Sequence, residues 1–178
     1  MTSESGKGSM AASVKALVDA GVERGVWHAL LRVDKYPDRA VDGHPDEVLE
    51  VEGNILQNAG IQLLLDLLAA LGGTAYTNSG NAYLAVGDNA RAQAEDATET
   101  NFNPDELDRK QATASVSGSV VTFQATFNDD SSLGDWEEVG VFNNAAADTG
   151  ALLNRFLSTL GTKGAGQTWV LTLTITIT

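Results

Sequence analysis

The final stretch of the chain, residues 168–178, alternates between apolar and hydroxyl-bearing side chains. Successive side chains of a β-strand point to opposite faces, so this alternation predicts a strand with one apolar face and one threonine face. Such a strand must bury its apolar face, and the C-terminal residues are therefore expected to belong to a sheet. The apolar face consists of Trp169, Leu171, Leu173, Ile175 and Ile177.

Short strands separated by glycine-rich or acidic turns are predicted along most of the chain. The clearest is 121–127, where Val, Phe and Ala alternate with Thr and Gln. The segments 26–33 and 47–52 are expected to form a hairpin with a long acidic tip. In 47–52 we expect Val48 and either Leu49 or Val51 to point inward. The remaining strands are predicted at 81–88, 111–117, 136–143 and 152–157, with a turn at 161–166.

One main helix is predicted at 59–71. Asn58 is its expected N-cap, and Gly72-Gly73 is expected to end it in a left-handed backbone conformation. Apolar residues recur with helical spacing and spread well beyond a narrow stripe. Such a helix is expected to be covered on most sides, by a sheet or also by a second chain. The apolar positions are Ile61, Leu63, Leu64, Leu65, Leu67, Leu68 and Leu71.

Two segments are expected to lie outside this framework. Residues 1–25 are expected to form a flexible arm, and within it residues 11–20 have the pattern of a short amphipathic helix. That helix either packs on its own domain or docks on a neighbouring subunit. The acidic segment 91–108 is expected to be either an exposed loop with a short helix or a stretch that becomes ordered only on assembly.

The predicted fold class is therefore α+β and mainly β. Residues 26–178 are expected to form a single domain, an antiparallel β-sandwich or sheet packed with one main Leu-rich helix, preceded by the N-terminal arm. A chain of 178 residues is long enough for one such domain with a sizeable core.

Charge and composition exclude several classes of function. The net charge of -13 disfavours binding to nucleic acid or to an anionic membrane, because both need clustered Lys and Arg. The chain has no cysteine, which excludes disulfides, thiolate metal sites and cysteine nucleophiles. Neither a secretory signal nor a membrane-spanning run is recognised in the sequence.

The sequence contains no recognisable motif for catalysis or for binding a metal or phosphate. His28 and His44 lack the spacing of a zinc site. The glycine-rich run 161–166 lacks the order of a phosphate-binding loop, and a turn is expected there. The acidic run 128–131 lacks the pattern of a calcium loop and is expected to be a solvated turn.

Paired carboxylates at 137–138 and at Glu50 and Glu52 are likewise expected to be solvated surface. No catalytic, cofactor-binding or metal-binding residue is predicted, and no cofactor is expected. An enzyme such as a cell-wall hydrolase would need a carboxylate pair or zinc triad that these residues do not supply.

Six blocks in fixed order carry a resemblance to a known family: EGNILQNAGIQLLLDLL, NAYLAVGD, VTFQATF, WEEVGVFN, LLNR and the closing LGTK…G.TW.LT.TI.I. Over residues 26–178 the chain resembles a family of tailed-phage virion structural proteins. More distantly, the order of the blocks resembles the N-terminal region of tail-fibre and tail-collar proteins. The N-terminal arm and the acidic insertion around 95–108 depart from typical members of the family.

The resemblance implies a non-enzymatic part of a virus particle. The main expectation is a capsid decoration (cement) protein on the outer surface of the phage head, made in the host cytoplasm. Its partners would be the major capsid protein of the same virion and further copies of itself, in a homotrimer. Neither nucleic acid nor a membrane is an expected partner. The alternative is a minor tail protein or the attachment domain of a tail fibre or collar.

Overall fold

The computed structural model describes residues 27–41, 43–53, 55–77, 80–89, 97–102 and 105–178. Nearly all regular structure in these residues is β-strand, and α2 (Asn58–Leu68) is the main helix. A single 3-10 turn, η1 (Asp130–Ser132), precedes β8. The strands are β1 (Trp27–Tyr36), β2 (Glu47–Glu52), β3 (Ile55–Leu56), β4 (Tyr83–Gly87), β5 (Glu106–Gln111), β6 (Thr113–Ser117), β7 (Val120–Phe127), β8 (Gly134–Phe142), β9 (Leu152–Lys163) and β10 (Thr168–Ile177).

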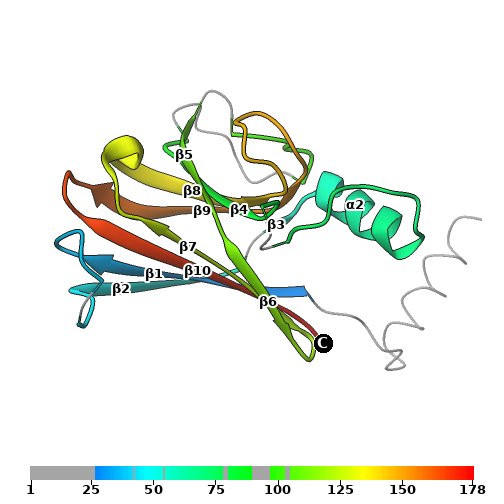
Figure 1. Cartoon of the computed structure of the whole chain (residues 1–178), viewed down its shortest axis with the longest axis horizontal. Coiled ribbons are helices and arrows are strands. Elements are labelled where there is room, and N and C mark those ends of the chain that lie inside the picture. Colours follow the sequence, from blue (N-terminus) through cyan, green and yellow to red (C-terminus); the bar gives the residue numbers. More distant parts are fainter. Residues whose placement is uncertain (1–26, 42, 54, 78–79, 90–96, 103–104) are drawn as a thin grey trace, which may run out of the picture.

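The strands form two antiparallel sheets of five strands each, which pack face to face (Figure 1). One sheet has the order β2-β1-β10-β7-β6, and the other has the order β3-β9-β8-β4-β5. Helix α2 lies beyond one end of this sandwich, and η1 lies at the opposite end (Figure 1). The structure therefore confirms the predicted α+β, mainly β class and specifies a sandwich.

Strand β10 is the middle strand of its sheet, with β1 on one side and β7 on the other. The predicted alternation is confirmed, because Trp169, Leu171, Leu173 and Ile175 are all buried. Ile177 is the exception and is 51% exposed at the edge of the core. The threonines of the other face, such as Thr172, are half-buried.

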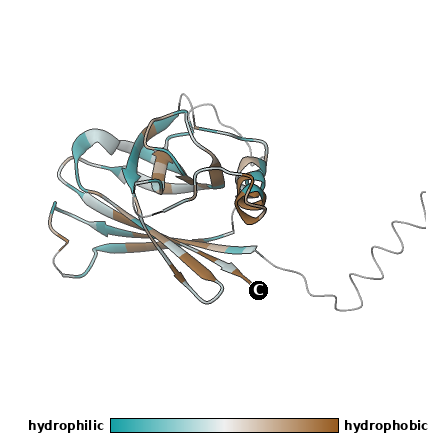
Figure 2. Cartoon of the chain, turned by 45° about the vertical axis from the view of Figure 1, so that its right-hand side comes forward, coloured by the Kyte–Doolittle hydropathy of each residue, from teal (hydrophilic) through white to brown (hydrophobic). Residues whose placement is uncertain are grey.

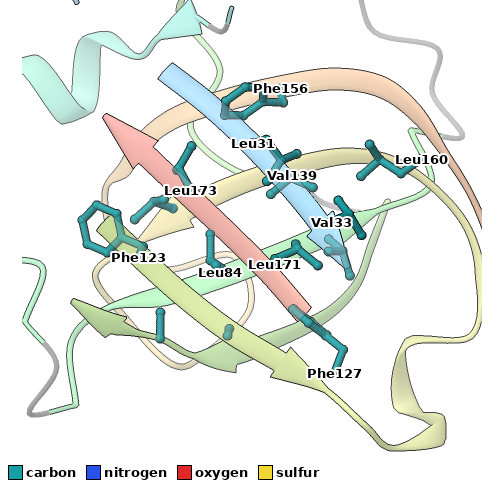
Figure 3. Packing of buried hydrophobic residues seen from close by; sticks show 14 of the residues in the cluster. Leu31, Val33, Leu84, Phe123, Phe127, Val139, Phe156, Leu160, Leu171 and Leu173 are labelled. Carbon is teal, nitrogen blue, oxygen red and sulfur yellow. The ribbon is translucent and has the colours of Figure 1, made fainter. Parts of the chain in front are cut away.

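The core fills the space between the two sheets (Figure 3). Both inner faces contribute large aliphatic and aromatic side chains, as aligned sheet packing requires. From the first sheet come Leu31, Val33, Phe123, Phe127, Leu171 and Leu173; from the second come Leu84, Val139, Phe156 and Leu160.

The β1–β2 hairpin is confirmed, but one assignment within it is wrong. Leu49 and Val51 are the residues of β2 that pack toward the core, whereas Val48 is exposed. The register pairs Leu49 with Val33 and Val51 with Leu31, which places those four side chains on the apolar face. Val48 has the opposite parity and faces solvent.

Part of the acidic segment that was predicted as a loop is a strand, β5. Residues 106–108 lie within β5, which pairs with β4 at the edge of the second sheet. The chain then crosses to the first sheet at buried Ala112, whose N–H donates to the Ala82 carbonyl, and continues as β6. The predicted strand 111–117 is therefore confirmed over 113–117 as β6, whereas Gln111 is the last residue of β5 in the other sheet.

The ends of several elements also differ from the predictions. The predicted turn at 161–166 begins later, because β9 continues through Lys163. Gln57 is the N-cap of α2, without a side-chain cap hydrogen bond, and Asn58 lies inside the helix. The predicted arm 1–25, its helix at 11–20 and the acidic residues 91–96 lie outside the described residues.

Candidate functional site

Helix α2 is attached to the sandwich along one narrow side. The Gln57 N–H donates to the Leu153 carbonyl at 2.9 Å, which places the start of the helix against β9. Gly60 makes this close approach possible, because a Cβ at this position would lie 2.6 Å from the Leu153 Cα. Within the helix only Gly60 and Leu63 are buried among the residues described.

The loop after α2 is also anchored to the second sheet. The Asn143 side chain donates to the Thr74 carbonyl at 2.6 Å and accepts a hydrogen bond from the Ala151 N–H. The Tyr76 hydroxyl donates to the Ala151 carbonyl at 2.9 Å. Burial raises the pKa of Tyr76, so this hydroxyl keeps its proton. These bonds hold α2 at both of its ends.

The apolar side of α2 that faces away from the sandwich is open in this arrangement. Leu65 is 54% exposed and Leu68 is 85% exposed. Within the described part of the chain β9 covers a single side of the helix, so the predicted cover on most sides is not supplied by the sheet alone, and cover by a second chain stays a prediction. Figure 2 shows the apolar colouring of the helix beyond the end of the sandwich. We call this surface the α2 face; it comprises Ile61, Leu64, Leu65, Leu68 and Leu71.

A second apolar surface lies at the same end of the sandwich, where the β6–β7 turn meets the end of β10 (Figures 1 and 2). Val116 of β6 is 75% exposed and stands next to half-exposed Ile177 around a shallow hollow. Contiguous exposed apolar residues of this kind mark contact surfaces more often than isolated ones do. We call it the hairpin patch; it comprises Val116, Val120, Val121 and Ile177, above buried Ile175.

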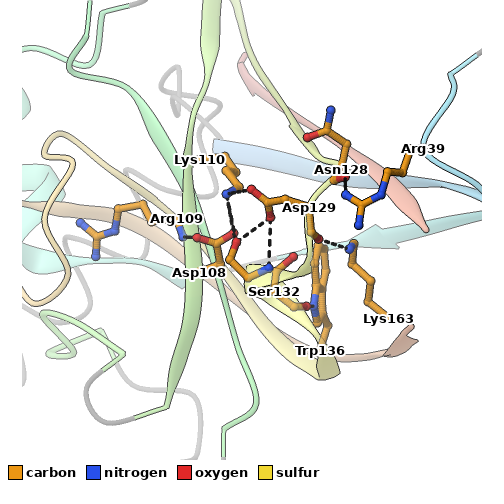
Figure 4. Close-up of polar contacts among 10 residues, drawn as sticks. Arg39, Asp108, Arg109, Lys110, Asn128, Asp129, Ser132, Trp136 and Lys163 are labelled. Atoms are coloured by element: carbon orange, nitrogen blue, oxygen red, sulfur yellow. Dashed lines mark hydrogen bonds and ion pairs between the residues drawn. The ribbon is translucent and has the colours of Figure 1, made fainter. Parts of the chain in front are cut away.

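The opposite end of the sandwich carries a polar network around Asp129 (Figure 4). Lys110 Nζ lies 2.6 Å from the Asp129 carboxylate and 2.9 Å from that of Asp108. The hydrogen bond from Lys110, together with those from Ser131, lowers the pKa of Asp129 to about 2. Lys110 comes from β5 and Asp129 precedes η1, so the network ties this loop to the edge of the second sheet.

Two further basic side chains hold the same loop. Arg39 bonds the Asn128 carbonyl at 2.6 Å and the Asp130 carboxylate at 2.7 Å. Lys163 donates to the Asp129 carbonyl at 2.9 Å, and burial lowers its pKa. The Asp129 and Asp130 carboxylates thus pair with the protein's own cations. No cluster of three or more potential metal ligands occurs in the part of the chain that the structure describes.

Glu138 differs most from its predicted environment. It is predicted on a solvated acidic surface, but its side chain is fully buried, and two nitrogens of the Arg155 guanidinium donate to one of its carboxylate oxygens, Oε2; the Arg155 side chain is 2% exposed. The nitrogen–oxygen distances are 2.5 and 2.8 Å. The neighbouring Glu137 points to the other face and accepts a hydrogen bond from Thr159. The two carboxylates therefore do not form an acid–base pair.

The other candidate residues are also kept apart. His28 and His44 are both exposed and lie at opposite ends of the β1–β2 hairpin. Glu50 is exposed and pairs with Arg32. Lys163, from the glycine-rich run, is buried within β9 rather than presented by a loop. The described residues thus assemble no catalytic constellation.

Sequence reasoning missed Arg109, which organises the loop after β8. Its guanidinium group donates to three backbone carbonyls, pairs with Glu106 at 2.7 Å and lies 3.8 Å from the centre of the Phe142 ring. In the sequence this position is marked only by its place directly after the acidic segment 91–108. The three carbonyls that it binds are 35 to 40 residues away along the chain, so no local pattern reveals them.

Comparisons with models of protein families, with curated proteins and with solved structures found no match to this chain. Within its described part, no helix combines the length and apolar character needed to cross a membrane.

Proposed function

We propose that this protein is a non-enzymatic structural protein that works by binding other proteins. The observation that supports this best is the hairpin patch at one end of the sandwich, on a chain with a net charge of -13. Strong like charge keeps the remainder of the surface soluble and discourages non-specific association. Exposed apolar residues concentrated at one end then favour a specific protein contact.

More specifically, we propose a capsid decoration protein that binds the outside of a tailed-phage head. The ordered resemblance of residues 26–178 to virion structural proteins favours this assignment over other binding roles. The partners would be the major capsid protein and further copies of this chain in a homotrimer. The protein would be made in the host cytoplasm and reside on the virion.

Mechanically, such a protein stabilises a shell by burying apolar surface across the joints between shell subunits. Specific interfaces bury on the order of 1,200–2,000 Å² in total. Binding to the assembled shell, and not to its separated subunits, shifts the equilibrium toward the shell by mass action. A rigid sandwich suits this task, because little conformational freedom is lost when it docks.

Imaging tests the assignment directly. Virus particles produced from the genome that encodes this chain are expected to carry its density on the outer surface of the head in cryo-electron microscopy. Density found only on the tail would contradict the decoration role and favour the alternative, a minor tail protein or a fibre or collar attachment domain. Absence from purified particles would contradict both roles.

A surface variant sharpens this test. Val116→Asp places a charge in the centre of the hairpin patch and is expected to reduce binding to undecorated heads at least tenfold in co-sedimentation. Val48→Asp is the matched control, because Val48 is also an exposed valine but belongs to β2 at the far edge of the same sheet. Equal binding by the two variants would show that the hairpin patch is not the contact.

A further inference from the structure

The α2 face presents apolar residues with the spacing of a helix–helix contact. Ile61, Leu64, Leu65 and Leu68 occupy positions i, i+3, i+4 and i+7 on the side of the helix that β9 leaves open. Gln62 and Asp66 form a hydrogen bond with each other on the polar side. We propose that residues 11–20 of the same chain dock on this face as an amphipathic helix. The proposal concerns a contact within one chain and goes beyond the assembly role.

The sequence of the arm supplies the complementary pattern. Val14, Leu17 and Val18 follow the spacing i, i+3, i+4, so one face of a helix over 11–20 would be apolar. Lys15 and Asp19 fall on the other side of such a helix, where water can solvate them. The other positions of the segment are alanine or serine, and small residues allow two helices to approach within roughly 8–10 Å between axes.

The start of β1, to which the arm is joined, lies within a short stretch of chain from α2. Strand β1 begins at Trp27, and the Ala29 carbonyl near this start accepts a hydrogen bond from the Gly53 N–H at 3.1 Å. Helix α2 begins at Asn58, a few residues after Gly53. Residues 21–26 can span up to ~20 Å when extended. The connection is therefore long enough for the arm to reach the helix of its own chain.

Length and charge also fit this occupant. A helix over residues 11–20 would be ~15 Å long, which matches the length of α2 between Asn58 and Leu68. Residues 1–26 contain three basic residues (Lys7, Lys15 and Arg24) and three acidic ones (Glu4, Asp19 and Glu23), so their net charge is zero. The acidic body of the protein therefore does not repel the arm as it would repel an acidic segment.

Docking within the chain is favoured over docking between chains at low concentration. A tether as short as residues 21–26 would give the arm a millimolar effective concentration at the helix of its own chain. A second copy at micromolar concentration competes poorly with it. Docking of the arm would cover the α2 face and leave the hairpin patch as the apolar surface available to another protein.

Disulfide trapping tests the proposal cleanly, because the chain contains no cysteine. The double variant Leu17→Cys/Leu68→Cys is oxidised at ~1 µM, where reaction within the chain is favoured. We expect an internally bridged monomer, identified by its non-reducing mobility and by the linked peptide in mass spectrometry. Asp19→Cys/Leu68→Cys is the matched control, since Asp19 lies on the polar side of the arm, and it is expected to bridge at least tenfold more slowly.

Two outcomes would overturn the proposal. A bridged dimer in place of the monomer would show that the arm reaches a second copy. Equal bridging by the two cysteine pairs would show that the arm has no preferred contact. Neither result bears on whether the protein is found on virus heads, so failure of this inference is distinguishable from failure of the proposed function.

Hydrogen exchange provides a second measurement on the full-length chain. Leu17→Asp places a charge in the proposed contact, and we expect exchange in peptides covering α2 to accelerate about tenfold. Lys15→Asp introduces the same side chain on the polar side and is expected to leave this exchange unchanged. Equal exchange in α2 for both variants and the parent protein would overturn the docking.

Discussion

Glu138 and Arg155 place opposite charges in a buried part of the second sheet. The Arg155 guanidinium donates two hydrogen bonds to Glu138 Oε2 and one, at 3.3 Å, to Asn89 Oδ1. The sequence does not predict this buried ion pair, because a Glu within WEEVGVF and an Arg within LLNRFL each resemble surface positions of an alternating strand. Only the register of β8 against β9, which pairs Glu138 with Leu157, places Arg155 diagonally opposite.

Removing one member of this pair is expected to cost much more than removing both. Arg155→Leu leaves the Glu138 charge buried without its partner, which typically costs about 3–5 kcal/mol of unfolding free energy. Glu138→Leu/Arg155→Leu removes both charges and is expected to recover most of that loss. Urea denaturation of the parent protein and the two variants measures the difference. A double variant less stable than Arg155→Leu would contradict this account.

Asp129 gives the stability of the protein a dependence on pH at the acid end. Its folded pKa of about 2 lies below the ordinary carboxyl value of about 3.9. A carboxylate with a depressed pKa stabilises the fold above its unfolded pKa, and this contribution is lost as the pH falls toward the folded pKa. The bonds from Lys110 and Ser131 are therefore expected to weaken between pH ~4 and ~2.

Asp129→Asn tests this dependence. The parent protein is expected to lose more stability than the variant when the pH is lowered from ~6 to ~2.5, because the variant has no carboxylate to protonate at this site. Urea midpoints at the two pH values measure both losses. Asp46→Asn, in the exposed β1–β2 tip, is the control and is expected to follow the parent protein. Equal acid losses in the parent and Asp129→Asn would contradict the assignment.

At the scale of single elements, α2 ends in a different way from the prediction. Ala70 adopts a left-handed backbone conformation with φ 56°, and the Leu71 N–H donates to the Asp66 carbonyl at 2.8 Å. The Ala70 N–H donates to the Leu67 carbonyl, which completes a Schellman motif. Gly72 and Gly73 also have positive φ but lie beyond this cap. The glycine pair therefore located the end of the helix to within a few residues, but alanine forms its cap.

Ala70→Gly is consequently expected to stabilise the protein. Glycine occupies the left-handed region without the Cβ strain of alanine, which is ~1–2 kcal/mol, but it loses more conformational entropy on folding. A net gain of about 0.5–1 kcal/mol is expected in urea unfolding. Ala69→Gly is the control, because Ala69 has φ -84° and is expected to lose stability. A loss at both positions would contradict the strained cap.

Gly60 determines where α2 sits against the sandwich. Gly60→Ala would place a Cβ in contact with the Leu153 backbone, which cannot move without disturbing β9. We expect a loss of about 1–3 kcal/mol in thermal or urea unfolding, as for other overpacked sites. Gly164→Ala is the matched control, since its Cβ would meet only the Gln167 side chain at ordinary distances. Similar stability for the two variants would contradict this role of Gly60.

The whole molecule shows which sequence patterns carry structural information. Alternation within β7 and β10 predicted buried faces correctly, because burial between two sheets imposes a period of two on every inner strand. The buried positions of these two strands could therefore be predicted from the sequence. The exposure of α2 could not be predicted, because an apolar helix has the same sequence pattern whether a sheet, an arm or another protein covers it. The candidate surface therefore became visible only when the sandwich left the helix uncovered.

Trp169 packs across the core against a ring of the other sheet. Its ring lies 4.7 Å from the ring of Trp136, and Trp136 in turn lies 4.9 Å from Phe127, with edge-to-face geometry in both pairs. Trp136 belongs to the second sheet, whereas Trp169 and Phe127 belong to the first. These contacts therefore cross the core, and loss of one ring is expected to weaken both layers together.

Trp169→Ala is expected to lower the unfolding free energy by about 3–5 kcal/mol, because it removes a buried ring and leaves a cavity between the sheets. Ile177→Ala, at the half-exposed end of the same strand, is the control and is expected to cost less than about 1.5 kcal/mol. Circular dichroism and the remaining tryptophan fluorescence should report one common transition in each variant. Separate transitions of the two signals in Trp169→Ala would show instead that the sheets unfold independently.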